Sequence, residues 1–177
     1  RGYLQLSQNV TDAGPSVAIN YNPGANRYMR IQWKHFGHRN GNYFSAGLSI
    51  VEFTHGLQIL RYGMWYYDFN NPPNDIPCYG WCMNKDGYSD SFIYSRIPNT
   101  NLSPTQSFDT WLNAEVVIDF EAGTIAPKLN GTTYASESIR TDWGNKIGIQ
   151  FSPYGWNTGH YLRIDDLSIQ SQNTAFP

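Results

Sequence analysis

Two aromatic-rich segments hold the residue types that could form a binding platform for a neutral polar ligand. The first carries Trp65, Tyr67, Tyr79 and Trp81 on either side of a proline-rich stretch, and the second carries Trp156. Glycine precedes both Trp81 and Trp156, which leaves one face of each ring sterically open. Because large rings bury much area when a ligand covers them, we predict that these five residues contact it. The alternative is that the rings only cap the hydrophobic core beneath a long loop.

A polar strand offers hydrogen-bonding groups for the same ligand. Residues 27–36 alternate apolar and polar side chains, so that Arg30, Gln32 and Lys34 share one face. Guanidinium, amide and ammonium groups donate hydrogen bonds to ligand oxygens. We predict that these three side chains bind the ligand, and the alternative is an ordinary solvated sheet face.

The chain has two cysteines, Cys78 and Cys82, which lie four residues apart and flank Tyr79 and Trp81. We predict a disulfide bond between them, because it would fix both rings in one geometry and lower the ordering cost of binding. The loop is too short for the bond to govern global stability, so reduction is expected to disturb binding more than folding. A disulfide indicates an extracellular compartment. Two reduced thiols are the alternative, and zinc is not expected since no second ligand pair exists.

The overall composition limits the classes of partner. The 177 residues carry a net charge of −2, with 15% charged and 16% aromatic residues. A protein that binds nucleic acid through phosphate charge needs a basic excess, so nucleic acid is not an expected partner. No apolar run approaches the roughly 20 residues of a membrane span, so membrane insertion is not expected either. Because the chain starts at Arg1, we expect it to be part of a larger protein or assembly.

Hydrophobic residues recur with a period of two along much of the chain, which predicts β-strands. The clearest strand has an apolar residue at nearly every second position from Leu112 to Phe120. Further strands are predicted at residues 27–36, 45–53, 56–67, 146–151 and 161–169. Turn signals such as Asn130-Gly separate strands, and no segment has a helical pattern. Residues 1–177 are therefore predicted to form a single all-β domain, an antiparallel sandwich or barrel.

Two segments resemble the concanavalin A-like lectin and glucanase superfamily, which includes laminin-G-like sandwiches. Residues 111–132 run as strand, turn and strand into an Asn-Gly turn, and residues 159–169 contain a closing Ile-Asp-Asp-Leu strand. The resemblance covers residues 108–170 by motif and the first hundred residues by strand pattern. It implies a two-sheet antiparallel jelly-roll sandwich, in which a strand at residues 3–6 lies beside the strand at residues 161–169.

The usual members of this superfamily bind or cut glycans, so the resemblance implies a carbohydrate ligand. Sugar rings present C–H faces that stack on aromatic side chains, which suits the predicted platform. In such sandwiches a closing-strand aspartate often helps to hold a structural calcium ion, and Asp165 and Asp166 stand at that position. The resemblance therefore makes Asp166 a candidate calcium ligand, among the six to eight oxygens that the ion requires.

Binding has more support in the sequence than catalysis. Glycosidases of this fold place carboxylates on one strand face at a spacing of two, whereas Val117 stands between Glu115 and Asp119 here. We therefore predict non-catalytic binding of a polysaccharide or other glycan by an extracellular or cell-surface protein. One alternative is a small polysaccharide lyase or glycoside hydrolase acting on the concave sheet. Its centre would be the strand from Arg30 to Lys34, with partners such as His35, Glu52 or Tyr62. Another is an adhesive or structural sandwich of a surface or virion protein.

Overall fold

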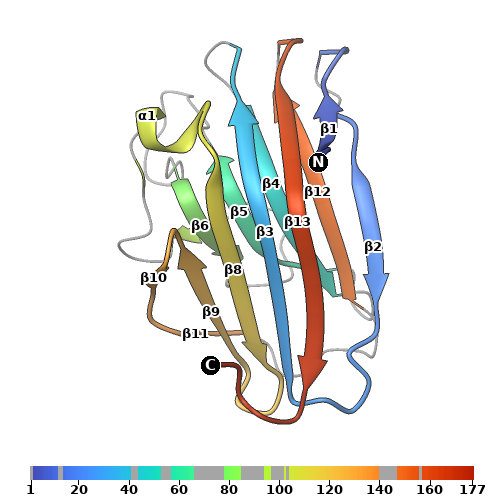
Figure 1. The fold of residues 1–177 in the computed structure, drawn as a ribbon, viewed down its shortest axis with the longest axis vertical. Coiled ribbons are helices and arrows are strands. Elements are labelled where there is room, and N and C mark those ends of the chain that lie inside the picture. The colour runs from blue at the N-terminus through green and yellow to red at the C-terminus, as the bar shows by residue number, and fades with distance from the viewer. Residues whose placement is uncertain are drawn as a thin grey trace.

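The computed structural model is a sandwich of two antiparallel β-sheets (Figure 1). It describes residues 2–11, 14–40, 44–52, 57–65, 78–84, 94–96, 102, 104–139, 147–155 and 157–177. The front sheet, nearer the viewer in Figure 1, has the strand order β1-β13-β3-β8-β9-β10, and β11 also pairs with β9. Its strands are β1 Leu4–Ser7, β3 Tyr28–His38, β8 Leu112–Asp119, β9 Thr124–Leu129, β10 Thr132–Thr133, β11 Glu137–Ser138 and β13 Tyr161–Gln172.

The back sheet has the strand order β2-β12-β4-β5-β6-β7. Its strands are β2 Val17–Tyr21, β4 Phe44–Glu52, β5 Leu57–Trp65, β6 Cys78–Asn84, β7 Tyr94–Arg96 and β12 Ile147–Gly155. A short helix, α1 Pro104–Ser107, precedes β8. No helix in the described ranges is long and apolar enough to cross a membrane. The predicted all-β, two-sheet antiparallel fold is confirmed.

The first and last strands lie side by side in the front sheet. β1 pairs antiparallel with β13, with Leu4 opposite Ile164 and Ser7 opposite Tyr161. β13 pairs in turn with β3, which pairs with β8. The expected pairing of an N-terminal strand with the closing strand is therefore confirmed, and it brings residues far apart in the sequence onto one sheet face.

Strict alternation along β3 and β8 builds the core between the sheets. Every second residue of each strand is buried, and the residues between are exposed or half-buried on the outer face. At the centre, the Trp33 ring of β3 meets the Trp81 ring of β6 edge-on at 5.9 Å and the Phe151 ring of β12 at 5.6 Å. Each fully buried side chain of this kind contributes ~1.5–3 kcal/mol. The core thus fixes which residues of β3 are left for the outer face.

His35 lies on the buried side of β3. Burial disfavours the charged imidazolium and lowers the pKa of His35 to about 3, so the side chain is neutral near pH 7. Because it alternates with Lys34 along the strand, His35 does not share the outer face with Arg30 and Lys34. The structure therefore places His35 in the core, not beside the polar strand face as a catalytic partner.

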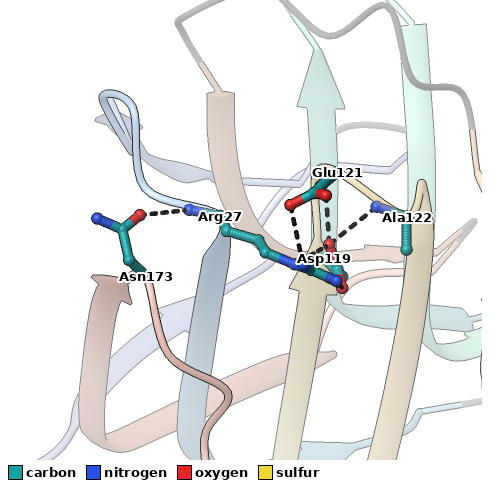
Figure 2. Close-up of polar contacts among 5 residues, drawn as sticks. All are labelled: Arg27, Asp119, Glu121, Ala122 and Asn173. Carbon is teal, nitrogen blue, oxygen red and sulfur yellow. Dashed lines mark hydrogen bonds and ion pairs between the residues drawn. The ribbon is translucent and has the colours of Figure 1, made fainter.

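Arg27 ties together the end of the front sheet where β3 begins and β8 ends, which is the lower end in Figure 1. Figure 2 shows its contacts. Its Nη2 donates to Asp119 Oδ2 at 2.8 Å, and its Nη1 lies 2.9 Å from Glu121 Oε2. Asp119 Oδ1 also accepts hydrogen bonds from the backbone N–H groups of Glu121 and Ala122, while Asn173 accepts one from the Arg27 backbone. The hydrogen bond from Arg27 holds the pKa of Asp119 below its ordinary value. This network joins β3, the β8–β9 turn and the segment after β13.

Candidate functional site

A groove of about 350 Å³ crosses β3, β8 and β9 on the outer face of the front sheet. Its lining residues are Gln32, Trp33, Lys34, Asn113, Ala114, Glu115, Lys128, Gly131 and Asp166. The charged members are Lys34 and Lys128 against Glu115 and Asp166, so the groove has no net charge. It therefore offers amide, ammonium and carboxylate groups to a polar ligand without a dominant field.

One wall of the groove is a bulge in β13. The pairing of β13 with β3 shifts between Asp165 and Ser168, and Asp166 adopts a left-handed backbone conformation with φ of 52°. The bulge brings Asp166 Oδ2 to 2.9 Å from Lys34 Nζ. A bulge re-aims side chains at the edge of a site, and here it aims a carboxylate at the predicted ligand-binding lysine.

The opposite wall is the turn between β9 and β10. Asn130 and Gly131 have φ angles of 49° and 83°, the pair of left-handed residues that a tight hairpin requires. Asn130 is fastened to β8, because its Oδ1 accepts a hydrogen bond from Asn113 N at 3.0 Å and its backbone N donates to Asn113 O at 2.8 Å. Between the walls, Gln32 Nε2 donates to Glu115 Oε2 across β3 and β8. The groove is thus built on paired strands, not on free loops.

Above the groove lies a group of partly exposed rings, called here the aromatic cluster: Tyr3, Phe36, Trp111 and Tyr161. The Phe36 ring lies 5.4 Å from the Trp111 ring and is parallel to the Tyr161 ring at 6.3 Å. The Tyr3 ring lies 6.0 Å from Trp111. Tyr3 is 48% exposed and Trp111 is 42% exposed, so both rings keep free area. The cluster is a surface feature made by β1, β3, β13 and the residue before β8.

A histidine and an aspartate border the aromatic cluster. His38 Nδ1 lies 2.6 Å from Asp109 Oδ1, and the imidazole stacks on the Tyr161 ring at 4.5 Å. Asp109 is held in a left-handed conformation, φ of 54°, by a hydrogen bond from its N–H to Gly37 O. Non-glycine residues in that conformation are uncommon and concentrate at functional sites. The pair adds an imidazole and a carboxylate to the same end of the face.

The groove and the aromatic cluster form one continuous face. Gln32 and Lys34 of the groove and Phe36 and His38 of the cluster region are alternate residues of β3 on its outer side. Trp111 comes immediately before β8, whose Asn113 lines the groove. From residue 30 to residue 38, β3 spans about 26 Å at the usual rise per residue. That length accommodates an extended chain rather than a single small molecule.

The three polar residues predicted from the sequence all lie on this face. Gln32 and Lys34 line the groove, and Arg30 lies further down the same side of β3. Arg30 Nη2 donates to Gln170 Oε1 at 2.6 Å, and its guanidinium lies 4.4 Å from the centre of the Phe176 ring. The structure therefore brings the predicted polar strand together with aromatic residues, but with different ones from those expected.

The predicted aromatic platform is not where the sequence placed it. Trp81 has 0% exposure and packs edge-on against Trp33, so its prediction as a stacking residue is wrong: no ring face is open to a ligand. It is buried because β6 pairs with β5 and alternates, which sends Trp81 between the sheets. Trp65 and Tyr79 are residues of β5 and β6 in the back sheet, with Tyr79 opposite Met64. Tyr67 and Trp156 lie outside the described residues.

The strand pairing does not support the predicted disulfide between Cys78 and Cys82. Both cysteines belong to β6, which pairs with β5 without interruption from Cys78, opposite Trp65, to Met83, opposite Leu60. Four residues of extended strand separate two Cα atoms by about 13 Å, whereas a disulfide requires less than about 7 Å. The cysteines therefore give no support to an extracellular location.

The role of Asp166 as a calcium ligand stays a prediction. Lys34 Nζ, a cation, lies 2.9 Å from its Oδ2, and Asp165 Oδ1 already accepts a hydrogen bond from Asp166 N. In the part of the chain that the structure describes, no three histidine, cysteine, aspartate or glutamate side chains gather as metal ligands. Asp166 pairs with Lys34 at the wall of the groove.

Sequence reasoning missed the aromatic cluster, although part of its signal was present. Phe36 stands two residues after Lys34 in the alternating strand, so the polar face had to include it. On β13, Tyr161 and Arg163 alternate with buried Leu162, so both side chains lie on the same outer face as Phe36. No local pattern shows that β1 and the residue before β8 would join them, because that depends on sheet order.

The comparisons with known proteins show the fold. No family model matches the chain, and no curated protein matches it. The structure of the alginate lyase AlyC3 in complex with dimannuronate matches with a TM-score of 0.64 at 10% identity, over 98% of this chain and 75% of that chain. An alginate lyase from Alteromonas sp. 272 matches with a TM-score of 0.61 at 6% identity, over 97% of this chain and 88% of that chain.

The potassium-bound carbohydrate recognition domain of Emp46p matches with a TM-score of 0.54 at 10% identity, over 97% of this chain and 83% of that chain. These identities are too low to transfer residues or activities, so the likeness concerns the sandwich alone. The chain therefore has the same jelly-roll sandwich architecture as these alginate lyases and this carbohydrate recognition domain.

Proposed function

We propose that this protein binds a polysaccharide across the outer face of its front sheet, without cleaving it. The observation that carries the proposal is the aromatic cluster, in which Tyr3 packs against Trp111 and Trp111 against Phe36, yet the Tyr3 and Trp111 rings stay nearly half exposed. Rings fixed by neighbours and open on one side bind sugar C–H faces at a low entropic cost. The groove beside them supplies hydrogen bonds from Gln32 and Lys34.

The proteins with the same fold support a carbohydrate ligand. One is described in complex with dimannuronate, and another is a carbohydrate recognition domain. A polysaccharide chain would lie along β3, from the groove to the aromatic cluster. Extracellular or cell-surface glycans are the natural ligands of such a face, and we propose that the protein works at that location.

The test is a binding screen with substitutions in the aromatic cluster. We expect the protein to bind at least one polysaccharide in a panel, and Trp111→Ala and Tyr3→Ala each to weaken that binding about thirtyfold, as truncation of an interface anchor does. Val10→Ala is the matched control, since Val10 is an exposed apolar residue outside the cluster. Unchanged affinity in both cluster variants would overturn the proposal.

A second candidate function, cleavage of the bound polysaccharide, rests on the His38–Asp109 pair. An imidazole held by a carboxylate is the usual arrangement of a general base, and the Tyr161 hydroxyl group lies on the ring that stacks against it. The test is release of new chain ends from the polysaccharide that binds best. Loss of that release in His38→Ala, with binding retained, would favour the enzyme; no release by the unsubstituted protein would exclude it.

A further inference from the structure

The side chain of Arg163 is enclosed by the rings of the aromatic cluster. Its guanidinium carbon lies 4.7 Å from the centre of the Tyr161 ring, 4.8 Å from that of Tyr3 and 5.1 Å from that of Phe36. Three rings around one guanidinium replace much of its water with π-faces, which favour the cation. They also restrict its position, so that the group is preorganised before any ligand arrives.

One edge of the guanidinium is already fixed. Arg163 Nε donates to Gln5 Oε1 at 2.8 Å, and Gln5 stands opposite Arg163 in the pairing of β1 with β13. Gln5 is itself held, because its Nε2 donates to Ser7 Oγ at 2.8 Å. Among the described residues, neither Nη nitrogen of Arg163 has a hydrogen-bond partner. Four N–H donors in a planar fork therefore remain for a ligand.

The acidic side chains of this face are engaged elsewhere. Asp109 pairs with His38, and Asp166 pairs with Lys34. Asp165, two residues from Arg163 on the same strand, accepts the hydrogen bond of Asp166 N. No carboxylate of the described residues lies within ion-pair distance of Arg163, so its charge is not neutralised there.

Arg27 shows how a purely structural arginine looks in the same sheet. Its Nε, Nη1 and Nη2 all contact the carboxylates of Asp119 and Glu121 (Figure 2). The guanidinium of Arg163 is also held in place, by Gln5 and three rings, but it contacts no carboxylate of the described residues. A guanidinium that is fixed, weakly hydrated and without a counterion suits an external oxyanion, which it binds through two parallel hydrogen bonds.

We propose that Arg163 binds an acidic group of the polysaccharide, a carboxylate or a sulfate, while the surrounding rings stack on the sugar that carries it. This inference rests on the proposed function, and it names the chemical class of the ligand. The groove, which has no net charge, accepts the neighbouring sugar units. The protein is therefore a receptor for an acidic polysaccharide, and Arg163 determines its preference over neutral chains.

The experiment compares three polymers of similar length: a neutral glucan, a polyuronate and a sulfated galactan. We expect the unsubstituted protein to prefer at least one acidic polymer, and salt to weaken binding of that polymer but not of the glucan. Arg163→Gln should lower affinity for the acidic polymer about thirtyfold and leave glucan affinity unchanged. Arg163→Lys should recover part of the preference, because lysine keeps the charge without the fork.

The control is Arg39→Gln, which removes the same charge from an arginine that also stacks on a ring, 5.1 Å from the centre of Phe108, outside the aromatic cluster. It should leave the preference unchanged. Equal loss of acidic and neutral binding in Arg163→Gln, or no acidic preference in the unsubstituted protein, overturns the inference while the proposed function stands. Binding of no polymer at all overturns the proposed function itself. The preference for polyuronate or for sulfated galactan identifies which oxyanion is bound.

Discussion

The two ends of the front sheet each hold an arginine on an aromatic ring, yet the surroundings differ. At the lower end Arg27 lies 5.0 Å from the centre of the Tyr28 ring and contacts two carboxylates. At the upper end Arg163 lies among three rings and contacts no carboxylate of the described residues. The difference indicates separate roles. The contacts at the lower end stabilise the sheet, whereas the upper end holds a preorganised guanidinium for a ligand.

The same contrast separates rings that pack from rings that bind. Trp81→Ala should lower the free energy of unfolding by about 3–5 kcal/mol, because it opens a cavity against Trp33 and Phe151. Trp111→Ala should lower it by about 1 kcal/mol or less, since Trp111 is 42% exposed. Denaturant unfolding measures both values. Equal losses in the two variants would mean that the aromatic cluster is an outlying part of the core.

Acid should destabilise the protein through His35, which is buried in the core. Burial lowers the pKa of His35 to about 3. Between pH 6.5 and 3, His35 therefore binds a proton in the unfolded chain but not in the folded protein. Stability from this group is complete above pH 6.5 and falls by about 1.4 kcal/mol per pH unit below it, or about 2 kcal/mol at pH 5. Unfolding curves from pH 7 to 4 measure the slope.

The variant that checks this assignment is His35→Gln, which should flatten the slope over that pH range. An unchanged slope would mean that another group causes the acid sensitivity. Binding experiments on the upper end belong above pH 6.5, where the titration of His35 has no effect on the fold.

The lower end should affect stability and leave binding alone. Asp119→Ala removes the acceptor for Arg27 and for two backbone N–H groups of the β8–β9 turn, and should lower the free energy of unfolding by about 1.5 kcal/mol. Polysaccharide affinity should not change. Since Arg27 lowers the pKa of Asp119, this contribution is present above the ordinary aspartate pKa and is lost as pH falls through the lowered value. A loss of binding in this variant would contradict the separation of the two ends.

The smallest effect is expected at the wall of the groove. Gly131→Ala places a side chain at φ of 83°, where it meets no neighbour but strains the backbone, at a cost of about 1 kcal/mol. Because Gly131 lines the groove, affinity should fall modestly as the turn adjusts. Thermal unfolding and polysaccharide titration measure the two effects together. The Gly2→Ala variant, whose added Cβ also meets nothing and whose backbone has no such φ, is the matched control.

Local alternation was sufficient to predict much of this fold. The period of two in residues 27–36 and 112–120 predicted β3 and β8, the burial of Met29 and Ile31, and the outer position of Gln32 and Lys34. Alternation works here because each strand has one face against the core and one toward solvent. The prediction for the segment around Trp81 was wrong, because its cysteines, glycine and aromatic rings suggested a loop. The segment instead forms β6, which pairs with β5.

The sequence by itself determined that the chain folds as a β-sandwich and that β3 presents a polar outer side. Only the tertiary structure decided which rings reach that side. Tyr161 meets Phe36 because β13 pairs with β3, and Trp111 meets it because β8 lies on the other side of β3. Tyr3 joins the cluster because β1 pairs with β13, and its ring contacts Trp111. Side-chain alternation is a property of one strand, whereas neighbours across a sheet follow from strand order and register. That order depends on burial of the whole chain, which no local pattern contains.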